Sequence, residues 1–268
     1  MKIKISHTTS YKYNLTVPKL IQCLKLYPSI CENQEILEWK ISSNFGKIIE
    51  SHIDALGHRV QNIFINNLCG KLKITSEGIV NTKNLSGIVK GLNEKVNPIC
   101  FLRETKLTEP CKKIKEILEQ AGEIKDQIEF THKLNLIVSN SIEYVSGSTT
   151  TSTSSTEALR QKKGVCQDFA HILISAARLS NLPARYVNGF LLEETKTGEN
   201  TTHAWVEIFL KNLGWIAFDP SHKKCIDENY VRISVGFDFI DASAIKGVKT
   251  NYDGKEYLDT KLNIQNCQ

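Results

Sequence analysis

The chain has 268 residues, of which 41% are hydrophobic and 24% charged, a composition typical of a globular protein with a sizeable core. Its formal charge of +5 comes from 34 basic and 29 acidic residues spread along the chain, with no basic stripe of the kind that binds nucleic acid. The sequence also lacks a signal-peptide pattern at its start and any run of about 18 apolar residues, so we expect no nucleic-acid partner, no membrane partner and a cytoplasmic location.

Short β-rich segments separated by turn residues occupy the chain from residue 2 to 82. They include KIKISHTTSYKY, HRVQNIFI and KLKITSEGIVNT, and the turns are marked by Gly46, Gly57 and residues 66–70. This pattern is typical of antiparallel β-structure. It predicts a β-rich N-terminal domain over residues 1–95.

Helical patterns follow in the next part of the chain. Thr108, just before Glu-Pro, is a candidate N-cap of a helix through KKIKEILEQA, because Thr is a good cap and Pro fits a first helical turn. Apolar spacing predicts a second helix at about residues 125–141. The Ser/Thr run over residues 146–156 is either a flexible linker or an ordered loop, because Ser154 and Glu157 have the spacing of a capping box.

The segment GVCQDFAHILISAARL, residues 164–179, places Cys166 in the first turn of a predicted helix. Free backbone N–H groups and the positive end of the helix dipole favour a thiolate at that position. Phe169 and Ile172 fall on one apolar stripe, which indicates a centrally packed helix. Pro183 cannot continue the helix and is expected to follow its end.

Two strand patterns, THAWVEIFL and WIAFDP, are joined by residues 211–214 and predict a hairpin. Pairing His203 with Asp219 centres this hairpin near residue 211, within a register step or two of its connection. Both side chains then lie on one face, where an imidazole N–H can donate to a carboxylate. Together with Cys166 they form a candidate Cys-His-Asp triad, although each has an ordinary alternative as a structural cysteine, a sheet histidine or a turn aspartate.

The three blocks GVCQDFAHILISAARLSNLPARYVNGFL, THAWVEIFL and GWIAFDPSH together resemble the transglutaminase-like superfamily, in particular its bacterial members described as cysteine proteases. LKLYPSICENQEILEWKI and YVRISVGFDFIDASAIKGV resemble other family segments more weakly. The resemblance implies an α+β, papain-related core over residues 96–245, with a central Cys helix packed on an antiparallel sheet and residues 246–268 as a C-terminal extension. It also implies that Cys166 is the nucleophile, that His203 is the general base and acid, and that Asp219 orients the imidazole.

The implied reaction is acyl transfer through a thioester, either hydrolysis of a peptide or amide bond or transfer of the acyl group to an amine. The expected partner is a peptide, protein or small amide substrate. The backbone N–H of Cys166 is one expected oxyanion donor, and Gln167 and Trp205 are candidates for the second. We expect no cofactor and no metal, because His222 and Cys225 lack further ligands at a suitable spacing. The oligomeric state is not predicted.

Two other classes of protein stay open at this point. One is a catalytically silent binding or scaffold module with an unreactive Cys166, and the other is a secreted protein held by disulfides. The eight cysteines are scattered and form no C-x-x-C pair, which favours reduced thiols. We also expect a capping role for Asp168, a packed helix position for His171, and structural roles for Arg185 and Tyr186.

Overall fold

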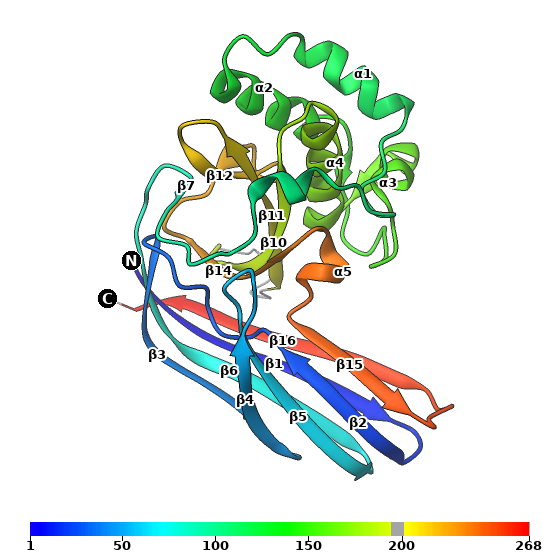
Figure 1. The fold of residues 1–268 in the computed structure, drawn as a ribbon. Coiled ribbons are helices and arrows are strands. Elements are labelled where there is room, and N and C mark those ends of the chain that lie inside the picture. The colour runs from blue at the N-terminus through cyan, green and yellow to red at the C-terminus, as the bar shows by residue number, and fades with distance from the viewer. Residues whose placement is uncertain (194–200, 268) are drawn as a thin grey trace.

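The computed structural model describes residues 1–193 and 201–267 (Figure 1). Layered β-strands form one end of the molecule, and helices gather around another sheet at the other end. Within the described residues, no helix combines the length and the apolar character that spanning a membrane requires. The α+β class predicted from the sequence is confirmed.

Two four-stranded antiparallel sheets form the β-rich end. One has the strand order β16, β1, β6, β3, and the other has the order β15, β2, β5, β4. Leu20 and Ile63 from one sheet share a buried cluster with Leu72 and Ile74 from the other, so the sheets pack face to face. The strands are β1 (Lys2–Tyr13), β2 (Val17–Leu24), β3 (Gln34–Ser43), β4 (Lys47–Ile53), β5 (Arg59–Leu68), β6 (Lys71–Thr82), β15 (Ile245–Thr250) and β16 (Glu256–Asn266).

The C-terminal segment completes both sheets of this end. Strand β16 pairs antiparallel with β1 from Ile3 opposite Asn266 to Tyr13 opposite Glu256, and β15 pairs with β2. The two chain ends therefore lie side by side (Figure 1). The domain boundaries at residues 95 and 245 stay predictions, while the structure adds that the last strands join the sheets of the first ones.

A six-stranded antiparallel sheet and most of the helices form the other end. Its order is β13, β12, β11, β10, β14, and β7 also pairs with β12. The strands are β7 (Ile88–Val89), β10 (Ala184–Leu191), β11 (Thr202–Leu210), β12 (Gly214–Asp219), β13 (Lys224–Cys225) and β14 (Tyr230–Gly236). A short parallel pair is β8 (Glu143–Tyr144) with β9 (Lys163–Gly164). The helices are the 3₁₀ turn η1 (Pro98–Leu102), α1 (Lys112–Ala121), α2 (Gln127–Ser139), α3 (Ser155–Gln161), α4 (Cys166–Leu179) and α5 (Phe239–Ala242).

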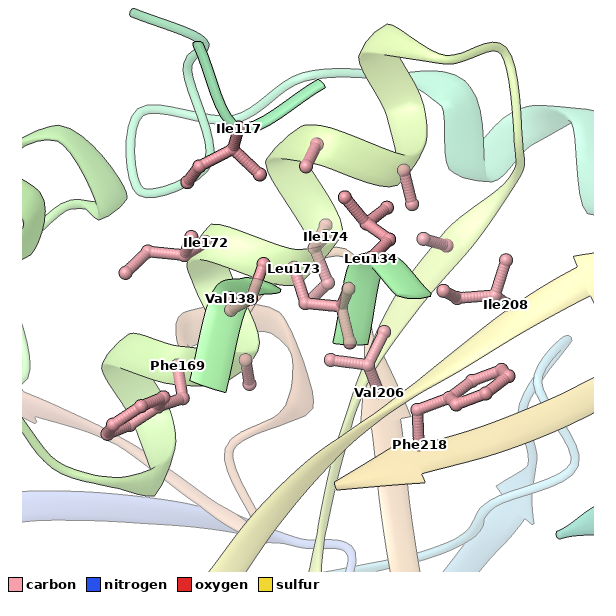
Figure 2. Packing of buried hydrophobic residues seen from close by; sticks show 14 of the residues in the cluster. Ile117, Leu134, Val138, Phe169, Ile172, Leu173, Ile174, Val206, Ile208 and Phe218 are labelled. Atoms are coloured by element: carbon pink, nitrogen blue, oxygen red, sulfur yellow. The ribbon is translucent and has the colours of Figure 1, made fainter. Parts of the chain in front are cut away.

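Helix α4 is the central helix of this unit. Its apolar side chains, including Ile172 and Leu173, are fully buried, and Leu173 lies near Leu134 of α2 and Val206 of β11 (Figure 2). Burying a side chain of this size stabilises a fold by about 1.5–3 kcal/mol. The predicted central packing of the Cys helix is confirmed, and it gives the first residue of α4 a fixed position above the sheet.

Two local predictions had different outcomes. Helix α1 begins at Lys112 rather than after a Thr108 cap, so that cap was predicted wrongly. The hydroxyl of Thr108 is fully buried and instead accepts a hydrogen bond of 2.8 Å from Arg178. The ordered alternative for the Ser/Thr run is confirmed, because the Ser154 hydroxyl accepts from the backbone N–H of Glu157 at 3.2 Å and α3 follows.

Candidate active site

Cys166 is the first residue of helix α4, and its surroundings are fixed by Asp168. The buried Asp168 carboxylate accepts hydrogen bonds from the backbone N–H of Val165 at 2.8 Å and from the hydroxyl of Thr149 at 2.6 Å. This is the predicted capping role. A Cβ on Gly164 would lie 2.6 Å from the Cβ of Asp168, so only glycine fits there. The helix start and the Ser/Thr loop are thereby joined around the thiol.

His203 and Asp219 come together at the edge of the hairpin formed by β11 and β12. The distance from His203 Nε2 to Asp219 Oδ2 is 2.6 Å. The predicted register is slightly wrong, because Val206 lies opposite Phe218 and His203 is therefore two residues away from the position opposite Asp219. The predicted shared face still holds, since an offset of two residues keeps side chains on one face of a strand.

The Asp219 carboxylate is fully buried and accepts hydrogen bonds on both oxygens. Besides His203, its Oδ2 faces His222 Nδ1 at 2.8 Å and accepts from the Tyr230 hydroxyl at 2.8 Å. Its Oδ1 accepts from the backbone N–H of Ser221 at 2.9 Å and from the Ser221 hydroxyl at 2.6 Å. This many donors keep a buried carboxylate ionised and fixed in orientation.

The protonation of this pair favours a cationic histidine. Burial alone raises the pKa of Asp219, but the hydrogen bonds and charges of His203 and His222 outweigh it and hold that pKa well below its usual range. Burial alone lowers the pKa of His203, but hydrogen bonds with Asp219 and Cys166 raise it to about 10. Because Nε2 of His203 faces Asp219, the other ring nitrogen, Nδ1, is the one available to the Cys166 thiol.

Cys166 and His203 open onto one cleft of about 230 Å³. The other side chains lining it are Tyr144, Ser146, Val165, Gln167, Tyr186, Asn188, Thr201, Thr202, Ala204 and Phe239. A larger hollow of about 480 Å³ between Arg103 and Lys246 lies elsewhere and holds neither the thiol nor the imidazole. Within the described residues, this cleft is therefore a place where one bound group can contact both the thiol and the imidazole.

Tyr144 lies directly beside Cys166. It sits in β8 opposite Gly164, and its ring stacks on Phe169 with 6.2 Å between the ring centres. Its hydroxyl lies beside the backbone N–H of Cys166, which acts to lower the pKa of the phenol. Burial, followed by the charge of Cys166, raises the pKa of Tyr144 to about 12, so the phenol keeps its proton and can donate it in a hydrogen bond.

Of the two residues predicted as candidates for the second oxyanion donor, one lines the cleft and the other is buried in the core. Gln167 lines the cleft. Trp205 is fully buried, and its indole N–H has no hydrogen-bond partner among the residues that the structure describes. Its ring packs edge-on against Tyr230, and a Cβ on Gly189 would lie 2.5 Å from it. Trp205 thus packs behind His203 and is absent from the lining of the cleft.

The remaining predicted residues lie in the core or beside the cleft. His171 is fully buried, burial lowers its pKa to about 4, and its Nε2 accepts from the backbone N–H of Phe239 at 3.2 Å. Arg185 bonds Glu207 at 2.7 Å inside the sheet. Tyr186 is buried but also forms part of the cleft wall.

One cluster in this region has the composition of a metal site. His203, Asp219 and His222 offer ligand atoms within 4.8 Å of one another, and Cys225, named with His222 in the sequence, is not part of it. The facing nitrogens and oxygen are already hydrogen-bonded to one another. The arrangement fits a chain of hydrogen bonds better than a metal centre.

Sequence reasoning missed Tyr144, Tyr230 and the contact between His222 and Asp219. The last was open to detection, because side chains three residues apart in a turn that follows Asp-Pro can meet. Tyr144 and Tyr230 reach the site through pairing of strands distant in the sequence, which no local pattern reveals.

Comparisons with known proteins agree with this architecture. Residues 115–220 match the family model of the transglutaminase-like superfamily, and residues 3–81 match the model of the bacterial transglutaminase-like N-terminal region. The chain thus carries a transglutaminase-like core. The recognition made from the sequence is confirmed, and the β-rich end contains the N-terminal region that belongs with such cores.

Similar proteins extend the likeness along the chain. Protein ML0607 of Mycobacterium leprae, described as uncharacterized, is 24% identical over 98% of this chain and 98% of its own. Rv2569c of Mycobacterium tuberculosis, also described as uncharacterized, is 30% identical over 45% of this chain and 42% of its own. The crystal structure of a candidate cysteine protease from Cytophaga hutchinsonii has a TM-score of 0.78 and 22% identity over 99% of this chain and 90% of that one. This last likeness confirms the fold of the transglutaminase-like core and its β-rich partner.

Proposed function

We propose that this protein is a thiol acyl-transfer enzyme in which Cys166, His203 and Asp219 form the catalytic triad. The observation that carries the proposal is the cleft where the thiol at the start of α4 meets an imidazole that is hydrogen-bonded at 2.6 Å to a buried carboxylate. A histidine in this setting is cationic and stabilises a thiolate beside it.

The reaction follows from the positions of these groups. The Cys166 sulfur attacks the substrate carbonyl carbon, and the carbonyl electrons move to oxygen to form a tetrahedral oxyanion. When the carbon–nitrogen bond breaks, the His203 imidazolium gives its proton to the leaving amine and a thioester remains. Water then attacks with His203 as base and releases the acid, or an amine attacks and forms a new amide.

Two donors support the oxyanion in this scheme. One is the backbone N–H of Cys166, and the second that we propose is the hydroxyl of Tyr144, which lies beside that N–H. The phenol keeps its proton and needs only to turn toward the substrate oxygen to donate. Gln167, which also lines the cleft, is the alternative second donor.

The substrate is a peptide, protein or small amide whose reacting group enters a narrow space. About 230 Å³ is smaller than the 300–1,000 Å³ usual for drug-sized ligands, so the cleft suits one side chain or a single amide group. We propose the cytoplasm as its location, supported by eight cysteines that are all unpaired thiols. We propose neither a nucleic-acid nor a membrane partner.

The second candidate function is a catalytically silent binding module, favoured by the position of the Tyr144 hydroxyl beside the Cys166 backbone N–H in the cleft. In that case Cys166 reacts no faster than the other thiols. The two functions differ in a single measurable property, the reactivity of one sulfur.

The experiment is iodoacetamide labelling as a function of pH, measured peptide by peptide with mass spectrometry. Ordinary thiols label at about pH 8.5 and above, and the seven other cysteines serve as internal controls. We expect Cys166 alone to label rapidly near pH 6 in the native protein, and His203→Ala to abolish this. A native Cys166 that labels like its neighbours contradicts the enzyme proposal and favours the binding module.

A further inference from the structure

A row of five ionisable side chains runs through the site. It begins with the Cys166 thiol and passes through His203 and Asp219, as described above. Beyond Asp219 it continues to His222, whose Nδ1 lies 2.8 Å from Asp219 Oδ2, and to Glu193, whose Oε1 lies 3.3 Å from His222 Nε2. The triad is thus the first part of a longer chain of hydrogen bonds that ends near the surface.

His222 is held from several elements. Its backbone N–H donates to Asp219 Oδ1 at 3.2 Å, and its ring meets the His203 ring edge-on at 5.1 Å between centres. The titratable groups facing it are Asp219 from β12, His203 from β11 and Glu193 beyond β10. The hydrogen bond with Asp219 raises the pKa of His222, burial and His203 lower it, and the net shift is upward. Its side chain is 28% exposed.

The neighbouring groups on the remaining strands do not reverse this balance. Tyr230 of β14 donates its hydroxyl to the same Asp219 oxygen. Lys224 of β13 pairs with Asp227 at 2.8 Å. His222 therefore lies between two carboxylates, and this position favours its cationic form.

We propose that His222 is a positioning residue that holds Asp219 in place and weakens the electrostatic attraction between the Asp219 carboxylate and His203. Two imidazoles share one carboxylate, so each cation weakens the hold of Asp219 on the other. This inference rests on the proposed acyl-transfer function for its catalytic meaning, because an imidazolium that binds its proton too tightly is a poor acid toward a leaving amine. His222 makes His203 a better proton donor.

The expected effect of His222 on the titration midpoint of His203 follows from the distance between the two rings. Two unit charges 5.1 Å apart shift each other's titration midpoint by about 0.6 pH units at a dielectric constant of 80 and by about 2.4 at 20. Since His222 is partly exposed, we expect a value in the lower part of this range, about one pH unit.

The test is a ¹⁵N NMR pH titration of the histidine rings in full-length Cys166→Ala protein. Removing the thiol removes one of the groups that raise the His203 midpoint and brings that midpoint into a measurable range. His222→Asn keeps a neutral donor where Nδ1 stands, and His222→Phe removes both donor and charge. His132→Asn is the matched control, because His132 packs on Phe218 and not on Asp219.

We expect the His203 midpoint to rise by about one pH unit in His222→Asn, to rise at least as far in His222→Phe, and to stay unchanged in His132→Asn. Glu193→Gln should lower the midpoint of His222 itself. A His203 midpoint that stays within about 0.3 pH units in His222→Asn, or moves downward, overturns the proposal, as does an equal rise in His132→Asn.

The proposed function is tested separately in the same series with the thiol restored. If Cys166 labels rapidly but the His203 midpoint does not move, only the proposed role of His222 is refuted. If the His203 midpoint rises but Cys166 is unreactive, the coupling between the histidines is supported and the acyl-transfer function is refuted.

Discussion

Replacing Asp219 with Asn removes the charge that supports His203 while keeping a side chain of the same shape. The pKa of His203 lies at about 10 against an ordinary 6.5, and at 1.36 kcal/mol per pH unit this difference corresponds to about 5 kcal/mol. Asp219 and Cys166 share this stabilisation, and we assign roughly half of it, about 2–3 kcal/mol, to the carboxylate. We expect the thiolate–imidazolium pair to become about 100-fold less populated, and turnover to fall further, toward the ~10⁴-fold known for a misoriented catalytic histidine.

The assay is the rate of Cys166 alkylation at pH 6, followed by mass spectrometry, with near-UV circular dichroism to show that the fold persists. Asp227→Asn is the matched control, because Asp227 pairs with Lys224 at the surface and has no contact with the triad. If folded Asp219→Asn protein alkylates at pH 6 as fast as the native protein, Asp219 does not support the imidazolium and the electrostatic reasoning fails.

Two further outcomes follow from the site. Tyr144→Phe should lower kcat by about 10²–10³-fold, the usual effect of losing one oxyanion donor, with little change in the alkylation of Cys166; an unchanged kcat assigns the role to Gln167. The pKa of His203 is raised to about 10 from 6.5, so its contribution to stability is complete below pH 6.5 and disappears as pH rises through 10. The pKa of Asp219 is lowered, so its contribution is complete above pH 3.8 and disappears in acid. The melting temperature should therefore fall more steeply between pH 6.5 and 10 in the native protein than in Asp219→Asn. Equal slopes in the two proteins would contradict this link between the pKa of His203 and stability.

Much of the site was predictable because its signals are local. The first turn of a helix favours a thiolate, and the alternation of a strand keeps His203 and Asp219 on one face even though the register was off by two residues. The Thr108 cap failed for a reason outside its segment, since the buried Arg178 takes the hydroxyl. Tyr144 could not be predicted as a neighbour of Cys166, because the contact depends on the parallel pairing of two short strands.

The fold was predictable to a similar degree. The α+β class and the central Cys helix follow from hydrophobic periodicity, which depends on neighbours a few residues apart. The pairing of β1 with β16 joins Ile3 to Asn266, and nothing in either segment encodes the partner. Strand partners chosen across the whole chain are set by the packed core rather than by local pattern.

That pairing also governs how the protein is made. During synthesis on a ribosome, β1 emerges before β6 and then pairs with it, but the other edge of β1 has no partner until β16 has also left the exit tunnel. The residues of the transglutaminase-like core are synthesised before β16. The core, with Cys166, can therefore fold while the first sheet still has an unpaired edge strand that is prone to aggregation. Contacts between such distant residues slow folding, and deleting β16 should yield an insoluble chain even though none of its residues lines the cleft.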